Sequence, residues 1–458
     1  MPFDLPQPGS YRDEALEHLR NLIRIDTGNP PGNELAAAQY VADTLAKEGL
    51  EPKVFESAPG RGNVWCRLKG NGTGRPVMLI AHLDTVPAQP EGWTHPPLEA
   101  AVADGCVWGR GALDMKNMAA MSLTSMLVLK RAGFAPTRDL LLCFTADEEA
   151  GGALGAGWMA DNQPDLIRAE YALGEVGGFS IETPRRRVYP VMNAEKGVAR
   201  LNVKARGEGG HGSMPVRDNA VSKLGIAAYR LSRLPLPPRV TPAAAGFIRT
   251  LARATGGVRG AAMRLMLVPA LTDIIIDYLV RDPEQQRFLR AILHDTVSPT
   301  VVRAGEQVNV IPTEAAMQLD GRFLPGVKIE EFVEETADAL GPLVTVEAAG
   351  YGPPIETPVD TPLFSAIERA ISEYDPGAIT APYLLTGYTD AKHYARLGVK
   401  TYGFTPLRLP PGFPFARLFH AVDERIPVDG FCEGTGVLAK LCADFCGRHQ
   451  NRAARTED

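Results

Sequence analysis

The pattern of apolar positions along the chain changes character near residue 197. Before it, short unbroken apolar runs at residues 77–81 and 140–144 alternate with stretches of helical periodicity. Neither run alternates apolar with polar positions, which is typical of strands buried on both faces between helices. Further strands are predicted at residues 54–55, 63–68 and 170–173, and helices at residues 11–25 and 118–131. The first part of the chain therefore predicts an α/β domain with a mostly parallel sheet.

Residues 199–205 instead alternate apolar side chains with Arg200, Asn202 and Lys204, the period-2 pattern of a sheet with one face in water. A helix is expected over residues 219–234. More helical patterns follow, one of them begun by Asp282 as N-cap with Pro283 in the first turn. The remaining strands of this part are predicted at residues 308–311, 317–323 and 344–348. A second domain is therefore expected to begin near residue 197.

From about residue 350 the pattern is again that of an α/β domain, with helices expected at residues 362–373 and 434–448. The simplest layout is one α/β domain built from residues 1–196 and 351–458, with a second domain of residues 197–350 inserted in it. The second domain is expected to carry a helical insertion at about residues 236–300.

Composition and charge narrow the class of protein and of partner. The 458 residues are 45% hydrophobic and 22% charged, an ordinary globular composition. A net charge of −6 leaves no overall basic field for a phosphate backbone, so no nucleic-acid partner is expected. Residues 263–280 are apolar but interrupted by charged residues and proline, so no membrane partner is expected. Residues 1–6 lack the features of a secretory signal and the six cysteines are widely spaced, which predicts reduced thiols and a cytoplasmic location.

Histidines and carboxylates follow the predicted strands of the α/β domain. They are His82 and Asp84 after residues 77–81, Asp114 after a Gly-rich turn, Glu148 and Glu149 after residues 140–144, Glu175 after residues 170–173, and His420 in the C-terminal segment. Taken singly, each has a plain structural explanation: a core histidine, a helix N-cap, a solvated charge run or a loop acid. Taken together they point to chemistry, because parallel strands bring their carboxyl ends to one edge of the sheet, where α/β proteins bind ligands.

Two histidines and three or more carboxylates, without cysteine, are a ligand set suited to zinc, with cobalt or manganese as alternatives. A closely spaced pair of such ions needs one carboxylate that bridges them. The assignment to the two ions is His82 and Glu175 on one, Glu149 and His420 on the other, and Asp114 on both.

Two further acids remain after this assignment. Glu148 lies beside the ligand Glu149, where a general base can take the proton of a water and return it to a leaving amine. Asp84 follows His82 by two residues and is expected to hold the second ring nitrogen of that histidine, which fixes its tautomer. The residues therefore predict metal-assisted hydrolysis of an amide.

The motifs that carry these residues resemble those of the M20 family of metallohydrolases, relatives of glutamate carboxypeptidase, succinyl-diaminopimelate desuccinylase, acetylornithine deacetylase and aminoacylase-1. In chain order they are His82-Leu83-Asp84-Thr85-Val86-Pro87, Gly109-Arg110-Gly111-Ala112 with Asp114 and Lys116, Asp147-Glu148-Glu149 with Gly151-Gly152, Glu175, His211-Gly212-Ser213 with Pro215, and His420. The resemblance spans nearly the whole chain and supports the site roles assigned above. It also implies two zinc ions per subunit and a cis peptide after Asp114.

The resemblance further implies that the inserted domain is a ferredoxin-like α+β lid through which two subunits form a homodimer. His211 matches the histidine that polarises the scissile carbonyl, often across the dimer interface. Asn309 and Arg322 match lid positions that bind substrate, and the planar fork of Arg322 suits a carboxylate. Gly387 and Thr389 lie in a turn that resembles a family loop near that carboxylate.

The substrate is expected to be a small molecule with a free carboxylate next to the cleaved amide, because Glu175 as third ligand resembles the carboxypeptidase and deacylase branches. The long lid and the loop of residues 409–419, rich in proline and phenylalanine, resemble the carboxypeptidase S and N-acyl-amino-acid hydrolase branch. We therefore expect peptides or N-acyl amino acids with an apolar acyl side. The apolar residues can equally serve as lid core or oligomer contact. A biosynthetic deacylase and a non-catalytic protein that keeps the fold are the alternatives.

Overall fold

The computed structural model describes residues 5–233 and 236–447, which divide into two compact units. Unit 1 comprises Met1–Met192, Thr357–Ala381 and Thr389–Asp458, and unit 2 comprises Asn193–Glu356 and Pro382–Tyr388. Leu234, Arg448 and the first four residues, on which sequence expectations fall, lie outside the described residues.

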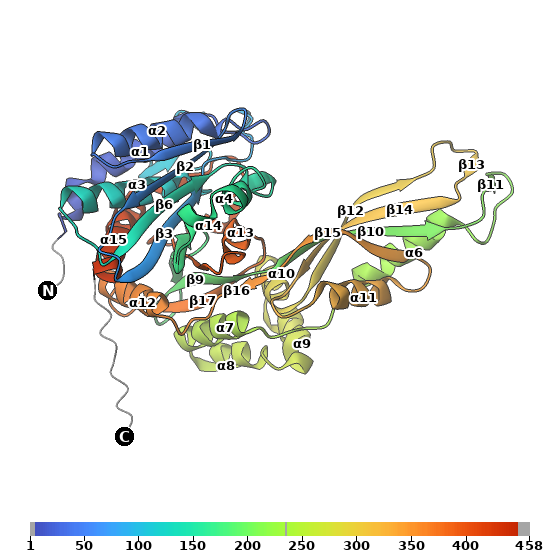
Figure 1. Cartoon of the computed structure of the whole chain (residues 1–458). Helices are drawn as coiled ribbons and strands as arrows, with labels where there is room; N and C mark the ends of the chain where they lie inside the picture. Colours follow the sequence, from blue (N-terminus) through green and yellow to red (C-terminus); the bar gives the residue numbers. More distant parts are fainter. Residues whose placement is uncertain (1–4, 234–235, 448–458) are drawn as a thin grey trace, which may run out of the picture. The chain divides into compact units, whose positions relative to one another are not determined.

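Unit 1 is an α/β domain (Figure 1). Its strands are β1 (Lys53–Ala58), β2 (Arg61–Leu68), β3 (Gly74–His82), β4 (Ala101–Ala103), β5 (Cys106–Trp108), β6 (Arg138–Thr145), β7 (Tyr171–Gly174), β8 (Ile181–Glu182), β18 (Lys400–Gly403) and β19 (Arg425–Pro427); β9 (Arg187–Glu195) and β17 (Ile379–Leu385) continue into unit 2. Its helices are α1 (Arg12–Arg24), α2 (Glu34–Lys47), α3 (Lys116–Arg131), α4 (Ala156–Asn162), α5 (Pro164–Ile167), α12 (Pro362–Tyr374), α13 (Ala391–Ala395), α14 (Phe415–Leu418) and α15 (Val428–Gly447), with 3-10 turns η1 (Pro8–Ser10) and η2 (Glu148–Ala150).

The centre of the unit 1 sheet is parallel, in the order β6-β3-β7-β18, and its flanking pairings are antiparallel. On β3, Val77, Leu79 and Ala81 pack into the core beneath α1, α2, α3, α12 and α15, while Met78 and Ile80 pack on the other face with α4 and α13. The unbroken apolar runs are thus strands buried on both faces. The α/β class with a parallel sheet centre is confirmed.

Unit 2 contains an antiparallel sheet in the order β12-β14-β10-β15. Its strands are β10 (Gly197–Arg206), β11 (Gly210–His211), β12 (Thr296–Ala304), β13 (Val310–Ile311), β14 (Glu314–Phe323), β15 (Thr345–Gly352) and β16 (Ile355–Glu356), and its helices are α6 (Ala220–Arg233), α7 (Pro242–Thr255), α8 (Gly257–Leu265), α9 (Pro269–Leu279), α10 (Pro283–Leu293) and α11 (Ile329–Leu340). The chain order β10-α6-β12-β14-α11-β15 with this strand order is the ferredoxin-like α+β arrangement. Burial along β10 alternates as its period-2 pattern predicts.

Several boundaries differ from the sequence prediction. Helix α2 was not predicted; its six buried residues include three alanines and Glu34, which gives a weak amphipathic signal. Helix α15 begins at Val428 rather than near residue 434, because the buried Phe431 and Cys432 extend its apolar face. In unit 2 the inserted helices end at Leu293, and β12 begins at Thr296. The strand expected at 308–311 is limited to β13.

No helix among residues 5–233 and 236–447 is both long enough and apolar enough to cross a membrane. All six cysteines are buried free thiols.

Candidate metal centre

The parallel part of the unit 1 sheet brings the predicted side chains to one edge. β6, β3 and β7 are neighbours in the sheet, so their carboxyl ends lie together. His82 is the last residue of β3, Glu149 lies in η2 just after β6, and Glu175 directly follows β7. The order of the strands therefore gathers three of the predicted metal ligands.

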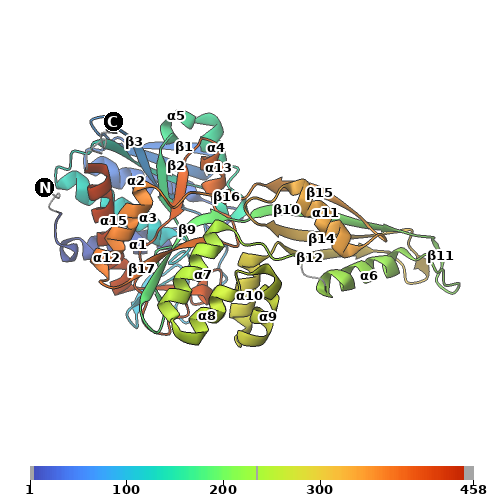
Figure 2. The same cartoon turned by 90° about the horizontal axis from the view of Figure 1, so that it is seen from below.

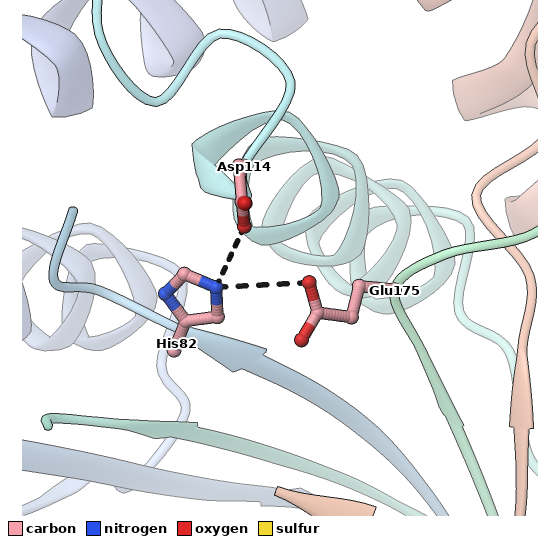
Figure 3. Close-up of side chains that lie close together, drawn as sticks. All are labelled: His82, Asp114 and Glu175. Carbon is pink, nitrogen blue, oxygen red and sulfur yellow. Dashed lines mark hydrogen bonds and ion pairs between the residues drawn. The ribbon is translucent and has the colours of Figure 1, made fainter. Parts of the chain in front are cut away.

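His82, Asp114 and Glu175 form a first cluster, in which one ligand atom from each residue lies within 4.8 Å of the others. His82 Nε2 lies 3.0 Å from Asp114 Oδ1 and 3.7 Å from Glu175 Oε2. Figure 3 shows this ring nitrogen linked to both carboxylates. The other ring nitrogen, Nδ1, lies 2.9 Å from the main-chain oxygen of Asp84 and 3.5 Å from Asp84 Oδ1. The carbonyl of Asp84, rather than the carboxylate expected from the sequence, is therefore the nearer partner.

Asp114, Glu149 and His420 form a second cluster of the same kind. His420 Nε2 lies 3.1 Å from Asp114 Oδ2 and 3.2 Å from Glu149 Oε2. His420 is in the loop between α14 and β19, where its backbone adopts a left-handed conformation with φ 59°. Asp114 belongs to both clusters and offers a different oxygen to each.

The loop that carries Asp114 is held by a buried acid that the sequence analysis did not select. Glu424 Oε1 accepts hydrogen bonds from the main-chain N–H groups of Leu113 at 2.7 Å and Asp114 at 3.1 Å. Arg110 Nη1 donates to Glu424 Oε2 at 2.6 Å. The peptide between Asp114 and Met115 is cis, as the resemblance implied. Glu424 therefore positions Asp114 from a segment more than 300 residues away along the chain.

The carboxylate of Asp84 positions the loop after β6. It accepts hydrogen bonds from the main-chain N–H groups of Glu148 and Glu149, each at 3.1 Å, and from Asn29 Nδ2 at 2.9 Å. Asn29 was missed because nothing in its local sequence distinguishes it from a turn residue before two prolines. Asp84 thus connects the His82 segment to the segment that carries two other site acids.

The charges of the site favour a bound cation. Burial alone would lower the pKa of His82, but the nearby Glu175 and Asp114 carboxylates raise it well above its usual range. Hydrogen bonds to Asp114 and Glu149 raise the pKa of His420 to about 10. Burial raises the pKa of Glu175 to about 7. Imidazole and carboxylate donors in two clusters with one shared acid are a fitting donor set for two divalent ions.

Glu148 is buried next to Glu149, a predicted metal ligand, but belongs to neither cluster. Burial, followed by the negative charge of Glu175, raises the pKa of its carboxyl well above the usual range. Its main-chain N–H, not its side chain, makes the contact with Asp84. The Glu148 side chain therefore lies at the site, and it does not form the hydrogen bond by which Asp84 holds the loop after β6.

Asp390 is a second acid that the sequence analysis did not select, and it lies near His82 and Glu175. Asp390 is buried, and its Oδ2 accepts a hydrogen bond from Thr145 Oγ1 at 2.8 Å. It lines a small cavity of ≈ 10 Å³ together with His82 and Glu175. Burial raises the pKa of Asp390 to about 7. The neighbouring Thr389, predicted to bind substrate, is buried and accepts a hydrogen bond from the main-chain N–H of Ala391 at 3.1 Å.

The remaining predicted residues lie in unit 2. His211 is exposed on β11, and its Nδ1 lies 2.8 Å from Ser213 Oγ. Asn309 lies alongside, since its carbonyl accepts a hydrogen bond from the N–H of Gly212 at 2.8 Å. Gly387 is half-buried.

Arg322 lies elsewhere on the unit 2 sheet, on β14 opposite Val198 of β10. Its Nε lies 2.7 Å from Asp320 Oδ1, and its guanidinium carbon lies 5.4 Å from the centroid of the Tyr388 ring. The guanidinium fork that was expected to bind a carboxylate therefore already carries an internal one.

Comparison with protein families matches residues 78–444 to the model described as peptidase family M20/M25/M40. Three curated relatives are similar along most of their length. The N-fatty-acyl-amino acid synthase/hydrolase PM20D1 of Homo sapiens is 27% identical over 78% of this chain and 71% of its own, and the probable carboxypeptidase S-like 2 of Dictyostelium discoideum is 28% identical over 78% and 69%. Aminoacylase-1 of Homo sapiens is 27% identical over 92% of this chain and 93% of its own.

Solved structures share the fold. The M20 family metallo-carboxypeptidase Sso-CP2 from Sulfolobus solfataricus superposes with a TM-score of 0.68 at 18% identity, covering 94% of this chain and 99% of that one. The YXEP protein of Bacillus subtilis, described as a dinuclear metal-binding peptidase of the M20 family, gives a TM-score of 0.58 at 15% identity, covering 96% and 99%.

Proposed function

Because this chain belongs to peptidase family M20/M25/M40 and is a metal-dependent hydrolase of amide or peptide bonds, we propose that it cleaves peptides or N-acyl amino acids with two bound zinc ions. The observation that carries the proposal is the pair of ligand clusters that share Asp114. His82 and Glu175 would hold one ion and Glu149 and His420 the other. When bound, two such ions polarise the scissile carbonyl and make water more acidic.

We propose a separate role in hydrolysis for each of several residues of the chain. Glu148 accepts a proton from the water that attacks the carbonyl carbon and delivers that proton to the leaving nitrogen as the carbon–nitrogen bond breaks. Asp84 and Glu424 hold the loops of Glu149 and Asp114 in place through main-chain hydrogen bonds. We propose that Arg322 binds the substrate carboxylate beside Asp320, with Gly387 and Thr389 as further contacts, and that Asn309, which lies beside His211, contacts a substrate together with that histidine.

An apolar acyl side is supported by the aromatic residues that precede His420. The rings of Phe415 and Phe179 lie 4.5 Å apart, and those of Phe415 and Phe419 lie 5.2 Å apart, measured between centroids. All three side chains are only partly buried and pack against the core of unit 1. They therefore present apolar surface next to a proposed metal ligand.

We expect kcat/KM to be about tenfold or more higher for N-dodecanoyl-phenylalanine than for N-acetyl-phenylalanine, because the added methylenes bury apolar surface. Steady-state hydrolysis of the two substrates by the zinc-loaded protein measures the ratio. In Phe415→Ala the preference should shrink, whereas Phe55→Ala, a half-buried phenylalanine that packs on Trp158, should keep it. An acetyl preference in the wild-type protein contradicts the apolar acyl side.

The geometry of unit 2 supports catalysis by two subunits. Along β10, Val198 pairs with Arg322 and Arg206 pairs with Glu314, while His211 follows beyond Arg206. Eight residues of strand span about 26 Å, so Arg322 lies beside one end of β10 and the β11-β13 pair that carries His211 follows beyond the other end. One small substrate cannot contact both side chains of the same unit. We therefore propose that His211 acts on the active site of a partner subunit in a homodimer.

A dimer through the lid is further supported by apolar side chains on the outer face of α6. Val221, Ile226 and Tyr229 are 44%, 49% and 62% exposed. Such a row of large apolar residues on one helix face suits an interface with a second copy.

Mixing two inactive variants tests action across the dimer. Neither Glu148→Ala nor His211→Ala homodimers should hydrolyse substrate, because each lacks one essential group at every site. After exchange of subunits, half of the dimers are hybrids with one complete site, so about one quarter of wild-type activity should return. Sedimentation of the mixture verifies that dimers have formed. Hybrid dimers without recovered activity contradict action of His211 across the interface.

A further inference from the structure

A second hollow lies within unit 2, on the inserted helices, and none of the residues assigned to hydrolysis lines it. Its volume is ≈ 560 Å³. The residues that line it are Gly246, Arg249, Thr250, Arg253, Arg264, Leu267 and Pro382. Figure 2 shows α7 and α8, which carry most of these residues, side by side.

One face of helix α7 lines the hollow. Residues 246, 249, 250 and 253 recur at helical spacing and therefore share one face of the helix. The opposite side of α7 is in the core, where Phe247, Ile248 and Ala252 are buried. At Gly246 an added Cβ would lie 2.8 Å from Pro382 Cγ, so glycine lets the helix approach β17 closely.

The cationic side chains of the hollow are not neutralised. None of the lining residues is acidic. Arg253 donates to the buried Thr250 Oγ1 at 3.1 Å, and neither Arg249 nor Arg264 forms an ion pair within the described part of the chain. By contrast, Arg239 in the same unit contacts Asp295, Glu331 and Glu335. Three arginines thus line one hollow that has no acidic lining residue, and their guanidinium groups are suited to bind an anion.

The size and the remaining lining identify the class of anion. A volume of ≈ 560 Å³ falls within the range of pockets that hold drug-sized organic ligands, far above the need of an inorganic ion. Leu267 and Pro382 provide apolar walls. A ligand that fills the hollow therefore combines a negative head with an apolar body.

We propose that this hollow is a binding site for an amphiphilic anion, a carboxylate or phosphate attached to an alkyl chain. Arg249, Arg253 and Arg264 bind the head group, and the chain lies against Leu267 and Pro382. The hydrolysis proposed above would release a carboxylate of this class, but binding at the hollow does not depend on that reaction. Binding can therefore be measured in the absence of turnover.

Isothermal titration calorimetry of the full-length, zinc-loaded protein tests the site with decanoate, decyl phosphate, decanol and inorganic phosphate, each below its aggregation concentration. Decanoate or decyl phosphate should bind at least about tenfold more tightly than decanol and inorganic phosphate, because only they combine charge with an alkyl chain. The tighter of the two identifies the head group. Equal affinity for decanol, or for inorganic phosphate, overturns the amphiphilic site.

Reversing the charge of two lining arginines tests whether the anion binds in this hollow. The double variant Arg249→Glu/Arg264→Glu should bind the preferred anion at least about tenfold more weakly. The control Arg259→Glu/Arg287→Glu changes the net charge equally at exposed arginines outside the lining and should bind like the wild type. Both variants should keep wild-type hydrolysis of an N-acetyl amino acid, which verifies folding. Unchanged binding in the first variant, or equal weakening in both, overturns the assignment to this hollow.

Discussion

Glu148→Ala is expected to lower kcat by about 10²- to 10⁴-fold, the usual contribution of a general acid–base group, while both metal ions stay bound. The loop should persist, because Asp84 holds it through the main-chain N–H groups of Glu148 and Glu149, which alanine retains. Glu148 also lies outside both ligand clusters. Steady-state hydrolysis of an N-acyl amino acid and metal analysis by mass spectrometry measure the two quantities on the same sample.

The adjacent residue provides the matched control. Glu149→Ala removes a carboxylate that lies 3.2 Å from His420 Nε2, so this variant should lose metal as well as activity. Glu148→Gln keeps the size of the side chain and should be as inactive as the alanine variant. Near-normal turnover in Glu148→Ala shows that another group transfers the proton, and loss of metal in that variant shows that Glu148 is a ligand.

The parts of the fold that sequence patterns predicted are those governed by local periodicity. The run at residues 77–81 has no polar position, and in β3 its side chains pack alternately on two helical layers. The alternation at residues 199–205 likewise appears as alternating burial in β10. Strand ends in a parallel sheet share an edge, so the position of His82 and Glu175 followed from the same patterns.

The connections between distant segments could not be predicted in this way. Arg110 and Glu424 are separated by 314 residues, and Asn29 meets Asp84 across 55. Such pairs have no periodicity and no fixed spacing, and they form only once the sheet has brought their segments together. Local sequence reasoning could therefore identify candidate metal ligands but not the groups that orient them.

The burial of Lys196 in unit 2 could not be predicted from local sequence either. Lys196 is fully buried, and its Nζ donates to the carbonyls of Ala291 and His294 at 2.9 and 2.8 Å. Lysine is normally read as a surface residue, and only the tertiary structure supplies these acceptors. Its burial lowers the pKa of the ammonium to about 7.

Asp114→Ala is expected to weaken the binding of both metal ions by about 100-fold or more, since even removal of an indirect partner of a ligand costs 10- to 100-fold. The reason is the sharing of this side chain: Oδ1 lies 3.0 Å from His82 Nε2 and Oδ2 lies 3.1 Å from His420 Nε2. Glu175→Ala, which removes a member of the first cluster only, should affect one ion more than the other. Competition with a chromogenic chelator measures both affinities.

Folding of the Asp114 variant must be separated from its metal affinity. Asp114→Asn keeps the shape of the side chain and should also lose both ions, because the amide carries no negative charge to share between them. Asp43→Ala, at an exposed position of α2, controls for removal of one carboxylate and should bind metal normally. Circular dichroism in excess chelator should give the same spectrum for all three variants and the wild type. One ion retained at wild-type affinity in Asp114→Asn contradicts a shared ligand, since the two clusters are joined only through this acid.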